Sequence, residues 1–395
     1  MTLQLTQKDF IDQDPIHLYV DLDITNNDFE GLEKPKNLVF NEVRNTPYLI
    51  NPSKYFFSVI RFQLDTPTLP VFIPKIEPNQ ADRDLTIYKL AMTYGGNEVV
   101  KTVKWITEEF STIYPIEPVG NRQELSTYYY SYTYKHFVNL LNTALDECLN
   151  ALPILPAPVA TITAPQFIYD DTTNKISLVA NSNYFNNGTG LNPVPNTAIN
   201  IYCNAPLKNL LSGFETVDYG FPVANPTINP LQYRFKIYPT SNNLSNIRIP
   251  PSTLSTVYYI TMTSEQLDIT LWNPIKSIVF TTGLIPVRPT MTSPPNDLGY
   301  DTFSSFGNNS NLVSQITDFV VPFSAGNTYK PNITYIVNSE YRLIDITSEL
   351  PFYSMQISVF WKNAYGDLIP FSVPSGSAGS IKILFRRKDF NTIKY

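Results

Sequence analysis

The stretch His17-Leu18-Tyr19-Val20-Asp21-Leu22-Asp23-Ile24 decides the fold class of this 395-residue chain. Its even-numbered residues are all aliphatic, whereas its odd-numbered residues are polar or aromatic. Because successive side chains of a β-strand point to opposite faces, this alternation predicts a half-buried strand. The aliphatic face is expected to lie on the core of an all-β structure.

Alternating or apolar runs of similar length recur along the chain. They are separated by turn residues, and the 33 Pro and 13% aromatic residues favour short strands between ordered turns. This spacing is typical of a sandwich or barrel of antiparallel strands and excludes an α/β fold, which would interleave helices. Besides 17–24, strands are predicted at 55–64, 69–73 (a Pro-bracketed edge piece), 85–94, 98–106, 166–169, 175–179, 199–203, 232–238, 257–262, 275–282, 315–321, 333–337, 355–361, 368–373 and 380–385.

One long helix is predicted at 134–152. Apolar residues recur there at steps of three and four, from Phe137 to Leu152, and Pro153 ends the pattern. A second, short helix is predicted at 204–213, because Asn204 is a favourable N-cap. The stiff Pro-rich connector that begins at Pro153 marks a candidate domain boundary.

Composition limits the class of protein. Charged residues make up only 16% of the chain, which is typical of a surface covered by other subunits, and the formal net charge of -6 argues against a dedicated nucleic-acid-binding protein. No apolar run is long enough to cross a bilayer, and the N-terminus lacks the pattern of a secretory signal peptide. We therefore expect neither classical secretion nor a membrane span.

Residues that carry catalysis or bind metals are scarce. The only histidines, His17 and His136, lie in predicted regular elements and outside recognised catalytic motifs. Cys148 and Cys203 are too few for a disulfide framework or a zinc site and are expected to be buried thiols. The sequence therefore predicts no enzyme, no cofactor and no metal site.

Acidic pairs and one aromatic cluster have structural explanations. Asp accepts backbone N–H bonds at turns, so a glycosidase with two close carboxylates is the least favoured alternative. The run from Tyr128 to Tyr132 is expected to pack on the start of the long helix, and stacking of a sugar is the alternative. The acidic pairs are Asp21 and Asp23, Asp82 and Asp84, and Asp170 and Asp171.

The C-terminal segment is basic, unlike the chain as a whole. Its positive residues stand against a single acid, Asp389. We predict that the segment contacts packaged nucleic acid or an acidic patch on a neighbouring subunit; the alternative is a solvated terminus that guards a strand edge. The basic residues are Lys382, Arg386, Arg387, Lys388 and Lys394.

Four segments of the last third resemble known proteins. They are WNPIKSIVFTT (272–282), EYRLIDI (340–346), QISVFWK (356–362) and PSGSAGSIKILFRRK (374–388), with an echo at 51–74. In style and order they resemble minor or penton-like capsid proteins of eukaryotic DNA viruses and virus-like elements, of the adenovirus, virophage and polinton-like kind.

The resemblance implies a jelly-roll β-sandwich formed by both chain ends, with an inserted β domain that projects outward. Here the shell jelly roll would comprise residues 1–120 and 271–395. The insertion, 121–270, would hold the long helix and a smaller β domain. Two similar jelly rolls, one on each side of Pro153, are a further possibility. No Arg-Gly-Asp motif is present, so receptor binding of the adenovirus kind is not implied.

These observations predict a structural capsid subunit, of the vertex (penton-like) or minor kind. It would assemble into pentamers in an icosahedral shell, contact other capsid proteins, be made in the host cytoplasm or nucleus, and reside in the virion. The alternatives are the main capsid protein of a small icosahedral virus and a carbohydrate-binding or adhesive β module that uses Tyr128 to Tyr132.

Overall fold

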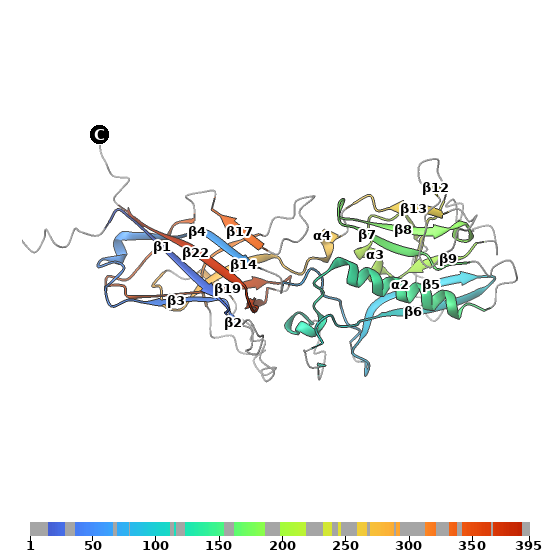
Figure 1. The fold of residues 1–395 in the computed structure, drawn as a ribbon, viewed down its shortest axis with the longest axis horizontal. Helices are drawn as coiled ribbons and strands as arrows, with labels where there is room; N and C mark the ends of the chain where they lie inside the picture. Colours follow the sequence, from blue (N-terminus) through green and yellow to red (C-terminus); the bar gives the residue numbers. More distant parts are fainter. Residues whose placement is uncertain are drawn as a thin grey trace, which may run out of the picture. The chain divides into compact units, whose positions relative to one another are not determined.

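The chain forms two compact units, and unit 1 is built from both chain ends (Figure 1). Unit 1 contains residues 1–69, 275–322 and 329–395, and unit 2 contains residues 70–274 and 323–328. The division at 274 lies close to the expected 270, whereas the division at 69 precedes the expected 120. The computed structural model describes residues 15–27, 36–65, 69–78, 80–110, 114–115, 123–153, 162–185, 198–218, 232–238, 244–245, 259–266, 269–287, 290–292, 313–320, 332–337, 342–364 and 366–388.

The first sheet of unit 1 joins the two ends of the chain. Its order is β1 (His17–Thr25), β22 (Ala378–Arg387), β4 (Tyr55–Asp65) and β17 (Asn332–Ile336), all antiparallel, and β18 (Ile344–Asp345) also pairs with β4. Val20 and Leu22 are buried while Asp21 and Asp23 are exposed, as the alternation predicted. β22 therefore lies between β1 and β4, inside the sheet.

The second sheet of unit 1 contains a strand that the sequence pattern did not reveal. β3 (Val39–Val43) is short, but it pairs with β19 from Ser354 to Ser358 and buries Phe40. The order is β15 (Thr290–Thr292), β16 (Val313–Phe319), β14 (Ser277–Thr282), β19 (Ser354–Lys362) and β20 (Leu368–Pro370), with β3 on β19; a separate two-stranded ladder joins β2 (Lys36–Asn37) to β21 (Ser372–Val373).

Aromatic side chains join the two sheets of unit 1. The ring of Phe62 on β4 meets that of Phe280 on β14 edge-on, with centroids 5.0 Å apart, and Phe319 on β16 lies 6.3 Å away. All three are buried. Two antiparallel sheets that share such a core form a β-sandwich, and the all-β prediction is confirmed.

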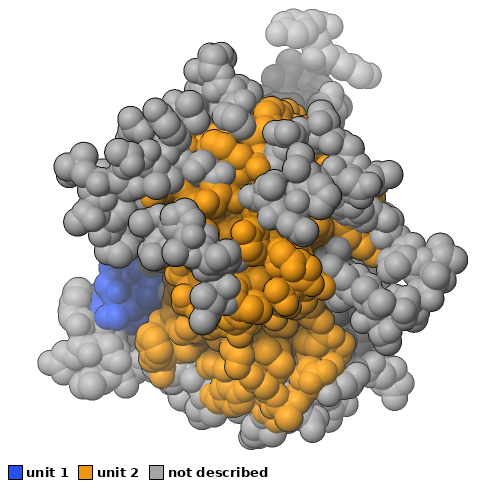
Figure 2. Space-filling model, turned by 90° about the vertical axis from the view of Figure 1, so that its right-hand side faces the viewer, with its two compact units in different colours: residues 1–69, 275–322, 329–395 blue, residues 70–274, 323–328 orange. Residues whose placement is uncertain are grey.

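Unit 2, whose described residues are orange in Figure 2, also contains two antiparallel sheets. β5 and β6 belong to it because β5 pairs with β9, whose residues lie more than 100 positions later; local patterns cannot show this pairing. Gly95 and Gly96 both have positive φ in the β5–β6 turn, as expected for a tight hairpin. The strand order of the first sheet is β10 (Thr216–Asp218), β11 (Tyr233–Phe235), β9 (Asn200–Cys203), β5 (Leu85–Tyr94) and β6 (Asn97–Lys104). The strand order of the second sheet is β12 (Leu244–Ser245), β13 (Tyr259–Thr263), β8 (Lys175–Asn181) and β7 (Gln166–Asp170).

The long helix α2 (Tyr134–Ala151) confirms the helical prediction to within one residue. The Thr133 side chain accepts a hydrogen bond from the His136 N–H and caps its start. Phe137 contacts the rings of Phe72, Tyr88 and Trp272. The predicted edge piece 69–73 forms only one bridge, Phe72 to Ser131. The shorter helices are α3 (Ala205–Leu210), α4 (Ile269–Trp272) and the 3-10 turns Pro52–Lys54, Gln123–Leu125, Thr127–Tyr129 and Ser182–Tyr184.

Candidate assembly surface

His136 has a structural place at the start of α2. Its Nε2 lies 2.6 Å from the carbonyl oxygen of Ile106, and its Nδ1 lies 3.5 Å from Oε1 of Glu108. The Glu108 carboxylate also accepts a hydrogen bond from the Thr133 hydroxyl. These contacts fasten the preceding loop to the first turn of the helix.

The acidic pairs hold turns and strands. Asp170 accepts hydrogen bonds from the Thr173 hydroxyl and the Thr172 N–H, and the bond from Thr173 is the largest cause that lowers the pKa of Asp170. Asp82 accepts from the backbone of Asp84 and from Lys104. Within the described ranges, no cluster of three or more His, Cys, Asp or Glu side chains could hold a metal ion, and no helix is long and apolar enough to cross a bilayer.

The tyrosine cluster packs inside unit 2. Tyr128, Tyr129 and Tyr130 are buried, and desolvation raises the pKa of each. The Tyr128 hydroxyl donates to Asp84, and the indole N–H of Trp105 donates to the Tyr128 carbonyl. Buried rings cannot stack on a sugar, so these three tyrosines do not support the adhesive alternative.

Both cysteines are buried free thiols, as predicted. Burial is the main cause that raises the pKa of Cys148 and of Cys203 to about 12. At neutral pH neither sulfur carries a useful fraction of thiolate, which is the nucleophilic and metal-binding form.

The predicted basic segment lies in the first sheet of unit 1. The expected strand 380–385 extends to Arg387, so Arg386 and Arg387 are strand residues, and Lys388 follows directly. Lys382 forms an ion pair with Asp21 at 3.2 Å, and Lys388 forms one with Asp345 at 2.8 Å. Lys394 lies outside the described residues.

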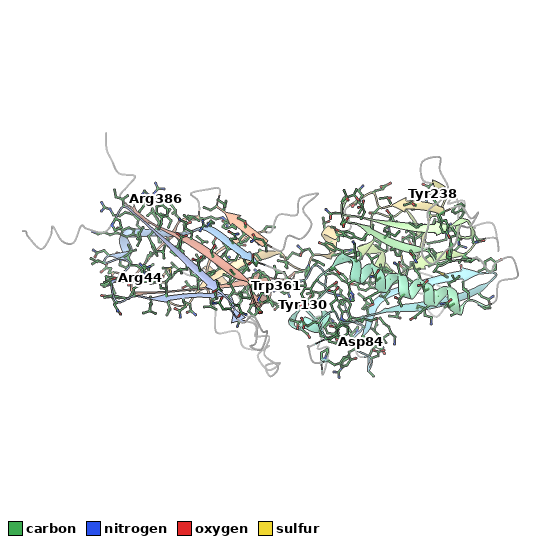
Figure 3. The ribbon with its side chains drawn as sticks, in the orientation of Figure 1. Arg44, Asp84, Tyr130, Tyr238, Trp361 and Arg386 are labelled. Atoms are coloured by element: carbon green, nitrogen blue, oxygen red, sulfur yellow. The ribbon has the colours of Figure 1, made fainter. Side chains whose placement is uncertain are left out.

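At one end of the unit 1 sandwich, which we call the terminal end, hydrogen bonds join five separate stretches of the chain. The Arg387 N–H donates to the Ile16 carbonyl, the Tyr55 hydroxyl donates to the Pro15 carbonyl, and the Arg44 N–H donates to the Tyr353 carbonyl. Figure 3 shows Arg386 of β22 at this end, and also Arg44, which directly follows β3. The stretches are 15–17, 42–57, 283–287, 344–355 and 385–388.

Exposed apolar side chains gather at the terminal end. It carries six of the fifteen large hydrophobic side chains that are exposed in the described residues, and Leu350 and Val43 are 75% and 71% exposed. Single exposed hydrophobic residues are ordinary, but such a group marks an interaction site. The six are Ile16, Val43, Ile50, Leu284, Leu350 and Tyr353.

The same five stretches also carry an excess of basic residues. The five stretches hold five Lys or Arg residues and three Asp or Glu residues, a positive balance on an acidic chain. Arg44 donates to Glu42 at 2.9 Å and lies over the Tyr48 ring; the Glu42 contact raises the pKa of Arg44, and the Arg44 contact lowers the pKa of Glu42. The charged residues are Glu42, Arg44, Lys54, Asp345, Glu349, Arg386, Arg387 and Lys388.

Sequence comparison connects most of the chain to virophage proteins. The family model of the Sputnik minor capsid protein V18/19 matches residues 18–387. The structural protein V19 of Sputnik virophage is 25% identical over 230 residues, which are 57% of this chain and 95% of that protein. Protein V18 of the same virophage is 31% identical over 122 residues, which are 29% of this chain and 72% of that protein.

Structural comparison also finds virophage proteins among the similar solved structures. A chain of the Sputnik virophage, solved by cryo-EM, matches with a TM-score of 0.77 and 26% identity, over 96% of this chain and 100% of that one. The mavirus penton protein matches with a TM-score of 0.59 over 94% of this chain and 99% of that one; at 15% identity this likeness concerns the fold, which is a penton-like jelly roll.

The resemblance to minor and penton-like capsid proteins of the virophage kind is thus confirmed, and it extends well beyond the last third of the sequence. The all-β jelly-roll prediction is confirmed with it. The chain belongs to the Sputnik minor capsid protein V18/19 family and is a structural subunit of a virus capsid, of the minor kind.

Proposed function

We propose that the chain forms pentamers at the vertices of an icosahedral shell. The observation that carries this proposal is the likeness to the mavirus penton protein along nearly the full length of both chains. Unit 1, closed by the pairing of β1 with β22, is the shell-forming sandwich, and unit 2 is its insertion. Cyclic contacts between identical subunits close a ring without exposed ends.

The outer face of the first sheet of unit 1 suits contact with a neighbouring subunit. Asp21 lies 3.2 Å from both Arg61 and Lys382, so one carboxylate serves two cations from neighbouring strands. Covering a charge is costly unless it is paired, and these charges already have partners. Lys382 then contributes to the neighbour contact as part of this pre-paired group.

At the terminal end, Arg386, Arg387 and Lys388 contact an acidic part of a neighbouring capsid subunit. Packaged nucleic acid is the other acidic partner that the basic C-terminal segment predicted. Nucleic-acid interfaces are strongly basic and polar, whereas the terminal end also carries exposed Leu350, Val43 and other apolar side chains. A mixed apolar and charged surface is the pattern of a protein–protein contact.

The subunit is made in the host cytoplasm or nucleus and carried in the virion together with other capsid proteins. The main capsid protein of a small virus is the second candidate and shares the fold, but the family match to a minor capsid protein favours the vertex role. We also propose that the chain has no enzymatic activity, because this family consists of structural capsid proteins.

Counting this chain in purified particles tests the vertex role. We expect five copies around each five-fold axis in a cryo-EM reconstruction, and a far smaller total than that of the main shell protein in a quantitative gel. Density for this chain on the flat faces, in hundreds of copies, would instead support the main capsid role.

A further inference from the structure

We propose that the acidic N-terminal segment of one subunit, residues 9–14, docks on the terminal end of unit 1 in the neighbouring subunit. This inference rests on the proposed assembly into rings and names the partner of its basic, apolar surface. The docking would cover Leu350, Val43 and Tyr353 and place acidic groups beside the surrounding cations.

The composition of the segment complements the surface. Residues 9–14 read Asp-Phe-Ile-Asp-Gln-Asp, with three carboxylates, two large apolar side chains and no cation. The terminal end has the opposite charge balance, because it carries five basic and three acidic side chains. It also carries six exposed apolar side chains. Opposite charges set the register and speed association, while the apolar contacts contribute most of the affinity.

The chain leaves unit 1 at the terminal end itself. The carbonyl of Pro15 accepts a hydrogen bond from Tyr55, and that of Ile16 accepts one from Arg387, so residue 15 is fixed beside the cations. At about 3.3 Å per residue, six residues span at most roughly 20 Å, so the docking requires the neighbouring terminal end to lie within that distance of residue 15.

The local sequence favours the neighbouring subunit over the chain's own surface. A residue that precedes proline is disfavoured in the helical region, so Pro15 biases Asp14 toward an extended conformation. β1 begins at the terminal end, where His17 pairs with Arg386, and runs away from it. Residues 9–14 contain no Gly, the residue that most easily reverses a chain. In a closed ring each subunit gives one segment and receives one.

Cross-linking of two variants of the full chain, each with one added cysteine, tests the docking. Ile11→Cys and Leu350→Cys chains are mixed, oxidised and analysed on a non-reducing gel, with the linked peptides identified by mass spectrometry. Native Cys148 and Cys203 are buried, and they will not compete. We expect a heterodimer linked between residues 11 and 350, reduced about fivefold in 0.5 M salt or when Asp9, Asp12 and Asp14 are changed to Asn.

Phe110→Cys is the matched control, because Phe110 is 83% exposed but belongs to unit 2. We expect no link from residue 11 to residue 110. A double variant, Ile11→Cys with Leu350→Cys, that links only within one chain would overturn the proposal. Sedimentation of the same samples separates the two ideas: rings without the 11–350 link refute the docking alone, whereas the absence of rings refutes the proposed assembly.

Discussion

Replacing Phe62 by Ala should loosen the sandwich of unit 1. The Phe62 ring is fully buried and meets Phe280 edge-on at 5.0 Å, with Phe319 at 6.3 Å, so it touches the opposite sheet through two aromatic partners. Truncating a buried Phe to Ala costs about 3–5 kcal/mol, and the lost aromatic pair places this site in the middle of that range. We expect a loss of about 4 kcal/mol in the free energy of unfolding of unit 1.

Hydrogen–deuterium exchange measures this loss locally. A change of about 4 kcal/mol corresponds to roughly a thousandfold rise in the open population, so amides of β22 and β14 that exchange through unfolding should exchange about a thousandfold faster. Phe167→Ala is the matched control in unit 2, because Phe167 is buried and meets Phe214 and Phe235 in the same edge-on manner; it should act on β7 and β8. Less than about tenfold faster exchange in β14 would show that the two sheets do not share this core.

Three further predictions concern charges and buried polar groups. Asp21→Asn should lower the free energy of unfolding by only about 0.5–1 kcal/mol, less at high salt, because Asp21 and Arg61 are exposed and Lys382 is partly exposed; urea titrations in low and high salt measure this, and a loss independent of salt would contradict it. Cys148 and Cys203 should resist a thiol reagent at pH 8 in the native protein and react once the protein is unfolded. The reason is that a pKa of about 12 leaves roughly one thiol in ten thousand ionised at this pH. Rapid labelling of the native protein would refute the burial of these thiols. Desolvation raises the pKa of Asp84, so its ionisation destabilises the folded state as the pH rises. The hydrogen bond from Tyr128 offsets part of this effect, so Tyr128→Phe should lower the free energy of unfolding more at pH 7 than at pH 4. Equal losses at both pH values would contradict this assignment.

The local sequence pattern was sufficient to predict most strands and the long helix. Alternation from Leu18 to Ile24 identified β1 and its buried face, and the spacing from Phe137 to Leu152 identified α2. β3 was missed because its five residues are too short for a clear alternation, and it is held by pairing with β19, more than 300 positions later. Short strands depend on such partners more than on their own sequence.

The domain boundary and the candidate surface depend on long-range contacts. β5 and β6 were expected in the shell domain, but pairing of β5 with β9 places them in unit 2. The basic residues were recognised in the sequence, although their place inside the sheet follows from the pairing of β22 with both β1 and β4. The exposed apolar group was not predictable, because Ile16, Val43, Leu284 and Leu350 come from separate stretches that only the folded chain brings to one end.

The most direct test of the vertex assignment is the mass of the assembled protein under native conditions. Native mass spectrometry of the purified full chain, over a range of concentrations, should show a dominant species of five times the 44.8 kDa chain mass. A chain that stays monomeric at every concentration, or that forms only dimers or trimers, would contradict the assignment.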